Sequence, residues 1–506
     1  MSVDNSEQPK LSNLSLVRDG HLEPVSERVT TGEVKMRPIQ RLGLLCDEGS
    51  LQVLRSAVIS ERMGARASAG DGVVGAAGRI GGRPVFCYAQ DASFAGGSLG
   101  QAHSETIVRV LHLARQANVP VIGFIESGGA RLQEGVAALN GYARIFAETV
   151  ALSGRVPQIS IITGTSAGGG SYSPALTDFV VMTDAASMFL TGPGVVREVT
   201  GEQTTARELG GPAVHERNGV CQLVVRSDVD SIFLVRELLG YLPQNAWQAL
   251  PVHAPAAPSG VHPAGVVPVD PRRPYDVRKV LEGVFDGRSV LELSSRWAPN
   301  IVTAFARLEG SPVGIVANQP AHLGGVIDAD ASQKAARFVR TCNSFGLPIA
   351  VLVDTPGFLP GTRQEAAGVI RHGAKLLHAF AEATVPKVTV VLRKSFGGAY
   401  ITMNSKDLGA QMYLAWTDAE LGIMGPHAAV DIIHRRELAA AADREATREQ
   451  LAREYREQHL SAAAAARGGF VDEVISPNET RSRLAWALSS LDGLEGGRGT
   501  VRNIPL

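Results

Sequence analysis

The stretch VPQISIITGTSAGGG, residues 156–170, decides the fold, and a similar stretch, VPKVTVVLRKSFGGA, occupies residues 385–399. Each has a Val-Pro pair, then a short run of mainly β-branched and apolar residues, then a glycine-rich loop. A short apolar run bounded by turn residues is typical of a buried strand. The same pattern twice in one chain indicates an internal repeat.

Other landmarks around these stretches keep the same spacing. The matched pairs share one offset to within a single position, and they are Gly82 and Gly310, Gly96-Gly97 and Gly324-Gly325, Pro120 and Pro348, and Pro157 and Pro386. A common offset for turn glycines and strand-opening prolines predicts two copies of one α/β domain. We expect the copies to occupy residues 1–250 and 270–506.

Each copy is predicted to contain the same elements in the same order. The expected elements are a strand (84–89 and 312–317), a helix (104–117 and 332–345), a buried strand (121–125 and 349–353), a second helix, and a strand (159–163 and 388–392) that ends in a glycine-rich loop. Strands that alternate with helices indicate a sequential β-α architecture with crossover connections. Residues 243–274 hold eight prolines and are predicted to be an extended linker. The charged, Ala-rich residues 434–467 are predicted to form an exposed or oligomer-packing helix.

Composition and charge limit the class of protein. A chain of 506 residues is too long for one ordinary core. It has 49 basic and 50 acidic residues and no basic stripe, which argues against a nucleic-acid partner. Its apolar runs are too short to span a bilayer, and its N-terminal stretch 1–20 is polar, so we expect a cytoplasmic protein. No spacing fits a zinc site, and buried thiols are expected at Cys46, Cys87, Cys221 and Cys342.

The two glycine-rich loops are candidates for binding negative charge. Residues 163–171 and 393–400 each follow a predicted strand and precede a predicted helix. Backbone N–H groups at a helix start lack acceptors, and glycine lets a ligand oxygen approach them closely. One such loop is equally consistent with a tight packing turn. Two at matching positions predict a site with two oxyanions.

Seven motifs make the chain resemble the β subunits of propionyl-CoA and acetyl-CoA carboxylases, from about Gly43 to Leu506. They are SGGARLQEG (127–135), SAGGGSYSPALTDF (166–179), LTGPGVVREVTGE (190–202), PVGIVANQP (312–320), DTPGFLPG (354–361), RKSFGGAY (393–400) and the terminal NIPL. The resemblance implies two tandem crotonase-like (ClpP/crotonase) β-β-α superhelix domains from an internal duplication. It also implies a homohexamer whose active sites each join the N-domain of one subunit to the C-domain of another.

The resemblance further implies the chemistry and the partner. The substrate would be an acyl-CoA, the carboxyl donor would be biotin, and no metal is expected in this chain. The chain has neither a Met-Lys-Met biotin-attachment motif nor an ATP-grasp signature. Biotin would therefore arrive on a biotinylated α subunit that contains biotin carboxylase and the biotin carrier.

Individual residue roles also follow from the resemblance. They are Gly168 and Gly169 as the N-domain oxyanion hole; Gly398 and Ala399 as the C-domain one; Gly97, Ser127, Gly128, Gly129, Ala130 and Arg131 as the CoA surface; Gly325, Phe358 and Leu359 as the biotin side; and Ile401 in the acyl pocket. Propionyl-selective members tend to carry Asp where Ile401 stands. The apolar side chain favours more varied acyl chains, because it places no charge beside them.

The chain departs from the family pattern at several places. Ser166 stands where members often have Cys, the first Gly-Gly loop reads SFAGGSLG, and the segment 212–218 is unlike the common sequence. These departures leave the acyl substrate open, including precursors for fatty acids or polyketides. Glu126 and Asp354 end matched strands, and we expect both in structural salt bridges.

Three other interpretations stay open from sequence alone. Residues 164–168 fit G-x-S-x-G, which would make Ser166 the nucleophile of an acyl hydrolase. No Asp and His follow in the context such an enzyme needs, and the repeat would be unexplained. A biotin-dependent decarboxylase subunit shares the motifs quoted above. A catalytically silent scaffold would have no use for two intact glycine loops.

Overall fold

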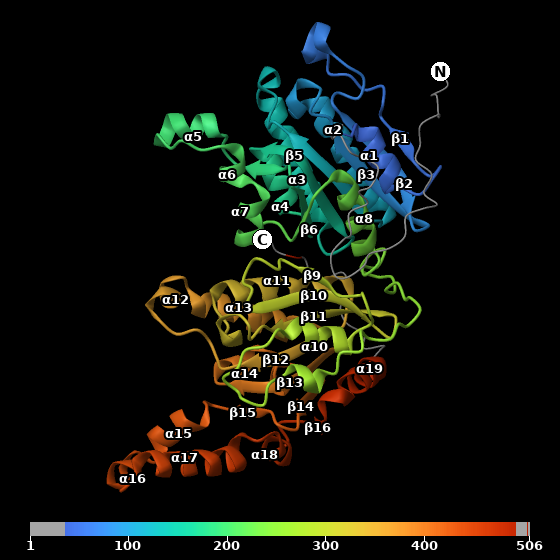
Figure 1. The fold of residues 1–506 in the computed structure, drawn as a ribbon. Coiled ribbons are helices and arrows are strands. Elements are labelled where there is room, and N and C mark those ends of the chain that lie inside the picture. The colour runs from blue at the N-terminus through green and yellow to red at the C-terminus, as the bar shows by residue number, and fades with distance from the viewer. Residues whose placement is uncertain (1–35, 492–502, 504–506) are drawn as a thin grey trace. The chain divides into compact units, whose positions relative to one another are not determined.

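Two eight-stranded sheets are built on the two copies of the repeat (Figure 1). The computed structural model describes residues 36–491 and residue 503. The first sheet has the order β1-β2-β3-β4-β5-β6-β8, with β7 beside β5, and the second has the order β9-β10-β11-β12-β13-β14-β16, with β15 beside β13. In both sheets the neighbouring strands are parallel from the third strand onward. The loops that leave the carboxyl ends of these strands therefore gather at one edge of each sheet.

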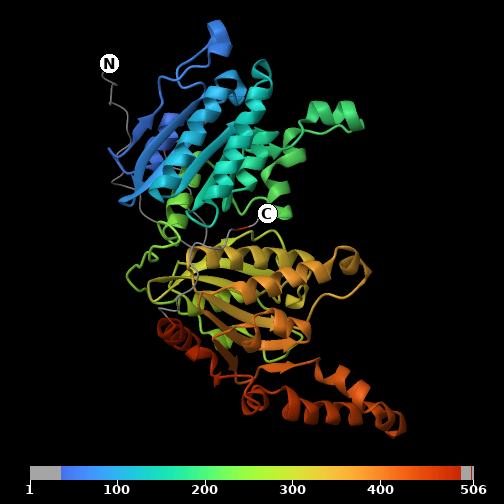
Figure 2. The same cartoon turned by 180° about the vertical axis from the view of Figure 1, so that it is seen from behind.

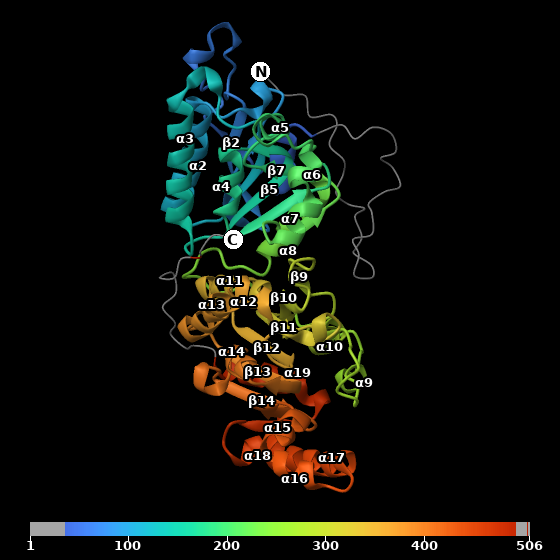
Figure 3. The ribbon, with the colours of Figure 1, turned by 90° about the vertical axis from the view of Figure 1, so that its left-hand side faces the viewer.

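The first copy contains the following elements: α1 (Pro38–Leu45), β1 (Gln52–Leu54), β2 (Val73–Ile80), β3 (Arg83–Gln90), α2 (Gln101–Ala117), β4 (Val121–Ser127), α3 (Val136–Leu152), β5 (Gln158–Ala167), α4 (Gly169–Ala175), β6 (Phe179–Thr183), β7 (Ser187–Phe189), α5 (Pro193–Thr200), α6 (Ala206–Gly210), α7 (Pro212–Asn218), β8 (Leu223–Val225) and α8 (Asp228–Leu239). Figure 3 shows α2 and α3 along one side of this sheet and α8 on the other.

The second copy repeats the central elements: α9 (Pro263–Val266), α10 (Val277–Val284), β9 (Leu291–Leu293), β10 (Ile301–Leu308), β11 (Ser311–Asn318), α11 (Ala329–Phe345), β12 (Ile349–Thr355), α12 (Thr362–Ala366), α13 (Val369–Glu382), β13 (Lys387–Phe396), α14 (Gly398–Thr402), β14 (Met412–Trp416), β15 (Glu420–Gly422), α15 (Pro426–Ile433), α16 (Arg435–Ala440), α17 (Arg444–Tyr455), α18 (Ala462–Arg467), β16 (Glu473–Ile475) and α19 (Thr480–Ser490).

The predicted repeat is confirmed for the central elements. The starts of β3, α2 and β4 recur at one constant offset as those of β11, α11 and β12, and the starts of β5 and α4 recur as those of β13 and α14 at an offset one position longer. The helix α2 shows why these segments fold locally as they do. Its buried residues follow helical spacing and include Ile107, Val110, Leu111 and Ala114, and it ends at Asn118, which has a left-handed φ of 51°.

Two segments differ from their predicted form. The predicted helix over residues 434–467 is broken into α16, α17 and α18 with a π-helical turn between the last two (Figure 2). Capping side chains explain new helix starts, because Asp443 accepts the Ala446 N–H and Ser461 accepts the Ala464 N–H. The proline-rich segment contains the short helix α9. The predicted N-terminal tail lies outside the described residues, and of the terminal NIPL motif only Asn503 is described.

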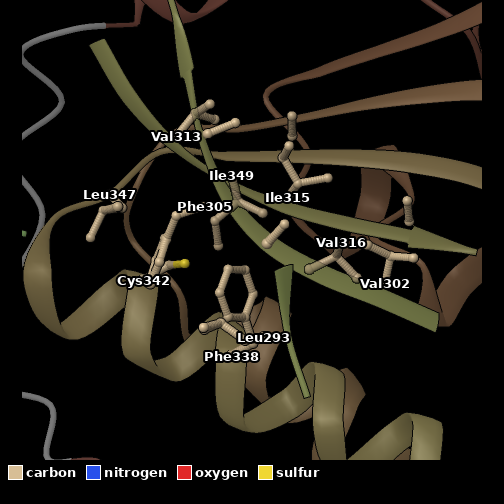
Figure 4. Packing of buried hydrophobic residues seen from close by; sticks show 14 of the residues in the cluster. Leu293, Val302, Phe305, Val313, Ile315, Val316, Phe338, Cys342, Leu347 and Ile349 are labelled. Atoms are coloured by element: carbon tan, nitrogen blue, oxygen red, sulfur yellow. The ribbon is translucent and has the colours of Figure 1, made fainter. Parts of the chain in front are cut away.

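A continuous hydrophobic core includes side chains of both copies. Phe305 of β10 lies at its centre and has no exposed surface. Its ring centroid is 6.0 Å from that of Phe179, 5.9 Å from that of Tyr241 and 5.2 Å from that of Phe338. Figure 4 shows Phe305 and Phe338 among the apolar side chains of this core. All four cysteines are free and buried, as predicted. Among the described residues, no helix is both long and apolar enough to cross a membrane.

The position of Phe305 predicts a large effect on stability. Phe305→Ala should lower the free energy of unfolding by about 3–5 kcal/mol, because it leaves a cavity where three rings meet. Phe233→Ala is the matched control, since Phe233 of α8 is 38% exposed. Chemical denaturation followed by circular dichroism measures both. Equal losses in the two variants would contradict this description of the core.

Candidate active site

The first glycine loop connects β5 to α4. Gly168 has a φ of 59°, a left-handed value that favours glycine, and it turns the chain into the helix. Its own N–H donates to the Phe189 carbonyl at 3.0 Å. The next two amides, of Gly169 and Gly170, have no hydrogen-bond acceptor in the described part of the chain. The loop thus offers two adjacent unpaired N–H groups at a helix start.

The second glycine loop connects β13 to α14 and repeats this geometry. Gly397 has a φ of 60°, and its N–H donates to the Gly422 carbonyl at 2.9 Å. The amides of Gly398 and Ala399 follow, and neither has an acceptor among the residues that the structure describes. The strands that accept the turn amides, β7 and β15, are themselves equivalent in the two sheets.

The geometry of the two loops fixes how they correspond. Gly168 is equivalent to Gly397, so the pair Gly169 and Gly170 corresponds to Gly398 and Ala399. The family resemblance implies that Gly168 and Gly169 form the first oxyanion hole. In the structure the Gly168 N–H donates to the Phe189 carbonyl, so it is not one of the unpaired amides of this loop. The sequences SAGGG and SFGGA do not reveal this one-residue shift. Either of the first two glycines of SAGGG can be matched to the first glycine of SFGGA.

An aromatic ring lies against each loop, but it comes from a different element in each copy. A Cβ added to Gly169 would lie 2.8 Å from the Tyr142 ring of α3. A Cβ added to Gly398 would lie 3.6 Å from the Phe358 ring, which also packs against Gly373 of α13. Tyr142 was not among the predicted site residues. Its position on a buried helix face gave no signal that set it apart from ordinary core residues.

Ser166 stabilises the first glycine loop through a hydrogen bond inside the loop. Its side chain is fully buried, and its hydroxyl donates to the Gly170 carbonyl at 2.8 Å. The Ser171 hydroxyl lies within hydrogen-bond distance of both the Ser166 and the Phe189 carbonyls. A nucleophilic serine needs a histidine base and an accessible hydroxyl. Ser166 has no exposed surface, and its hydroxyl proton goes to a carbonyl of its own loop, which disfavours the hydrolase interpretation.

The loop after β4 lies beside the first glycine loop. It is fixed by two backbone hydrogen bonds, from Leu99 N–H to the Gly129 carbonyl at 2.8 Å and from Arg131 N–H to the Leu99 carbonyl at 3.0 Å. Gly97 must be glycine here, because a Cβ would lie 2.2 Å from the Glu126 carbonyl oxygen. Ser127 is buried, and its hydroxyl lies 3.2 Å from the Tyr142 hydroxyl.

Arg131 is not available to a ligand in this structure. Its side chain has no exposed surface and forms ion pairs with Asp71 at 2.6 Å and Glu134 at 2.8 Å. Burial raises the pKa of Asp71, although the hydrogen bond from Arg131 opposes the shift. At Glu134, burial acts to raise the pKa. The hydrogen bonds from Gln101, Ser60 and Arg131 together outweigh burial, so the pKa of Glu134 is lowered. The Arg131 side chain therefore anchors the loop from inside.

The corresponding loop of the second copy follows β12. The Ile327 N–H donates to the Gly357 carbonyl at 3.0 Å, and the Leu359 N–H donates to the Ile327 carbonyl at 2.8 Å. A Cβ on Gly325 would lie 2.5 Å from the Asp354 carbonyl oxygen. Phe358 is half-buried beside Gly398, whereas Ile401 of α14 is 49% exposed. The Phe358 ring thus lies beside Gly398, and Gly325 packs against the backbone near the end of β12.

The predicted salt bridges at the strand ends are confirmed. Arg41 Nη1 lies 3.2 Å from Glu126 Oε2, and Arg393 Nε lies 2.9 Å from Asp354 Oδ2. Within the described residues, no group of three or more His, Cys, Asp or Glu side chains could hold a metal ion.

Paired sheets with matched loops define a duplicated crotonase-like α/β enzyme. A family model described as the carboxyl transferase domain matches residues 32–493. The propionyl-CoA carboxylase beta chain of Saccharopolyspora erythraea is 46% identical over 500 residues, which cover 95% of this chain and 91% of that protein. The biotin-dependent acetyl-/propionyl-coenzyme A carboxylase beta5 subunit of Mycobacterium tuberculosis is 44% identical, covering 96% of this chain and 92% of that one.

A solved structure is similar throughout the fold. The transcarboxylase 12S hexamer with methylmalonyl-coenzyme A bound has a TM-score of 0.88 and 44% identity, over 92% of this chain and 91% of that one. The chain belongs to the carboxyl transferase family, and it is the carboxyltransferase subunit of a biotin-dependent acyl-CoA carboxylase.

The buried position of Ser166 generates a direct test. Ser166→Ala should keep carboxyl transfer within about fivefold of wild type, because it removes one hydrogen bond worth about 1 kcal/mol. A fluorophosphonate probe should not label the wild-type protein, while a serine esterase treated in parallel should be labelled. Labelling that disappears in Ser166→Ala would instead identify Ser166 as a nucleophile.

Proposed function

We propose that the two glycine loops are the oxyanion holes for carboxyl transfer from biotin to the α-carbon of a short or medium acyl-CoA. One observation carries the proposal: both copies present two adjacent N–H groups without acceptors among the described residues, at equivalent positions. The donors would be Gly169 and Gly170 in the first loop and Gly398 and Ala399 in the second. Amides that are held in place before the reaction stabilise a developing oxyanion without reorganising.

The chemistry requires two such sites. Loss of the α-proton places negative charge on the thioester oxygen of the acyl-CoA, and loss of the carboxyl group places it on the ureido oxygen of biotin. When bound, biotin supplies the carboxyl group and a ring nitrogen that can accept the α-proton. The chain's own contribution is to hold the two carbonyl oxygens, align the reacting atoms and exclude water.

The surroundings of the loops support an assignment of sides. We assign acyl-CoA to the first copy, where it would contact Gly97 and the loop from Ser127 to Ala130 mainly through backbone atoms. We assign biotin to the second copy, beside Gly325, Phe358 and Leu359. The half-buried Phe358 ring offers an apolar surface next to the Gly398 amide, which suits a compact bicyclic ring.

The exposed apolar residues near both loops support a site that is completed by a second subunit. Leu132 is 90% exposed just after the loop from Ser127 to Ala130, and Ile370 is 77% exposed on α13, one helical turn before Gly373. Exposed apolar groups of this kind mark interaction surfaces. We propose a homohexamer, like the transcarboxylase 12S assembly. Biotin would be supplied in the cytoplasm by a biotinylated α subunit with biotin carboxylase and carrier domains.

Reconstitution tests the function. The purified chain would be mixed with a biotinylated α subunit, ATP, bicarbonate and acyl-CoAs from acetyl to long and branched chains, and products would be read by mass spectrometry. We expect ATP-dependent carboxylation of at least one acyl-CoA. Omission of ATP is the control. A complex that assembles but yields no carboxylated product would contradict the proposal.

The Ile401 side chain is predicted to influence which acyl-CoAs the enzyme carboxylates. Ile401→Asp should shift the profile of kcat/KM values toward propionyl-CoA, because longer acyl chains would then lie beside a partly desolvated carboxylate. The same acyl-CoA panel measures the shift. Val53→Asp changes an exposed apolar residue of β1 in the same way and should leave the profile unchanged. An identical profile in Ile401→Asp and wild type would exclude Ile401 as a selector.

A further inference from the structure

A buried ion pair lies under the second glycine loop. Asp354, near the end of β12, has no exposed surface, and Arg393, near the end of β13, is 7% exposed. Arg393 Nε lies 2.9 Å from Asp354 Oδ2. A buried pair of this kind is costly unless each charge also finds further partners, so its remaining contacts indicate what it holds together.

Arg393 holds the segment that connects the two copies. Its Nη1 donates to the Asp270 carbonyl at 3.2 Å and to the Arg273 carbonyl at 3.0 Å. Its guanidinium carbon lies 5.0 Å from the centroid of the Tyr275 ring. The neighbouring Lys394 donates to the Pro271 carbonyl at 3.0 Å. The segment 270–275 is therefore fastened to β13, although its sequence predicted only a spacer.

Asp354 connects the same point to the facing loop. Its N–H donates to Asn318 Oδ1 at 3.3 Å, and Asn318 Nδ2 donates to the Gly325 carbonyl at 3.2 Å. Its own carbonyl oxygen lies where a Cβ on Gly325 would be only 2.5 Å away. The ion pair thus links the base of the Gly325 loop to β13, the strand that leads into the turn before Gly398.

The first copy repeats the carboxylate but not its partner. Glu126 stands at the position equivalent to Asp354 and pairs with Arg41 of α1. The position equivalent to Arg393 is Gly164, where a Cβ would lie 2.2 Å from Glu126 Oε1. The carboxylate at the strand end is present in both copies, while each copy supplies its arginine from a different element.

We propose that Asp354, Arg393 and Tyr275 are positioning residues for the second oxyanion hole, and that the segment 270–275 is part of its support. The inference rests on the proposed function. None of the three side chains is proposed to touch a substrate. They fix the ends of β12 and β13 relative to each other, and so fix the direction of the Gly398 and Ala399 amides. Small displacements of such donors slow the reaction steeply.

The test removes both charges at once, so that neither is left buried alone. The full-length double variant Asp354→Asn/Arg393→Gln would be assayed with the biotinylated α subunit. We expect kcat to fall by roughly 10- to 100-fold with KM for the acyl-CoA within about twofold of wild type, because transition-state alignment and not binding is lost. Tyr275→Leu should lower kcat in the same direction, and Tyr275→Phe should lower it less, because it keeps the ring over Arg393 and loses only the hydroxyl beside Asp354.

A second ion pair in the same copy, between buried Asp286 and partly buried Arg481, provides the matched control. Asp286 pairs with Arg481 at 2.7 Å and accepts the Glu309 and Gly310 amides at the β10–β11 turn, at the opposite ends of the strands. Asp286→Asn/Arg481→Gln should lower the melting temperature but leave kcat of the folded protein unchanged.

The possible outcomes separate this inference from the proposed function. A selective loss of kcat in the Asp354/Arg393 variant supports the inference. Wild-type kcat in that folded variant and in Tyr275→Leu, or an equal loss in the Asp286/Arg481 variant, would overturn it while leaving the proposed function intact. If the double variant does not fold, the contrast between Tyr275→Leu and Tyr275→Phe decides. Wild-type protein that transfers no carboxyl group would instead remove the proposed function and this inference with it.

Discussion

The two glycine turns at the ends of β5 and β13 are the constraint on which the site depends. At φ values of 59° and 60°, Gly168 and Gly397 direct the chain from a parallel strand into a short helix. Their own amides are bonded to the neighbouring strands β7 and β15, which fixes the turns. The next two amides in each loop meet no acceptor in the described part of the chain. The buried Ser166 hydroxyl is bonded within the first loop, and an arginine pairs with the carboxylate near the end of β4 and of β12.

The duplication places the same strand, glycine loop and helix in both copies. Differences between the copies give the two glycine loops different surroundings. In the first copy the ring beside Gly169 is Tyr142 of α3, whereas in the second the ring beside Gly398 is Phe358 of the loop after β12. The arginine that neutralises the strand-end carboxylate also changes its origin, from α1 to β13. Two oxygens of different molecules can therefore meet the same kind of amide pair in differently shaped surroundings.

Sequence alone predicted the repeat, the strand and helix order, the strand-end salt bridges and both glycine loops. These features depend on local patterns and on one spacing, which are visible without coordinates. It could not show that the Gly168 amide is bonded to Phe189, or that Arg131 is sealed between Asp71 and Glu134, because such contacts join residues distant in sequence. For the same reason Tyr142 was missed, and residues 270–275 were predicted to be a spacer.

Vibrational spectroscopy of the bound carbonyl groups tests the central claim most directly. Carbon-13 would label the thioester carbonyl of an acyl-CoA in one sample and the ureido carbonyl of biotin in another, each bound to wild type, Gly169→Val and Gly398→Val. The account predicts that both carbonyl stretches shift to lower frequency in the wild-type protein, and that each loop variant abolishes one shift and spares the other. Carbonyl frequencies equal to those in water, or unchanged by both variants, would contradict it.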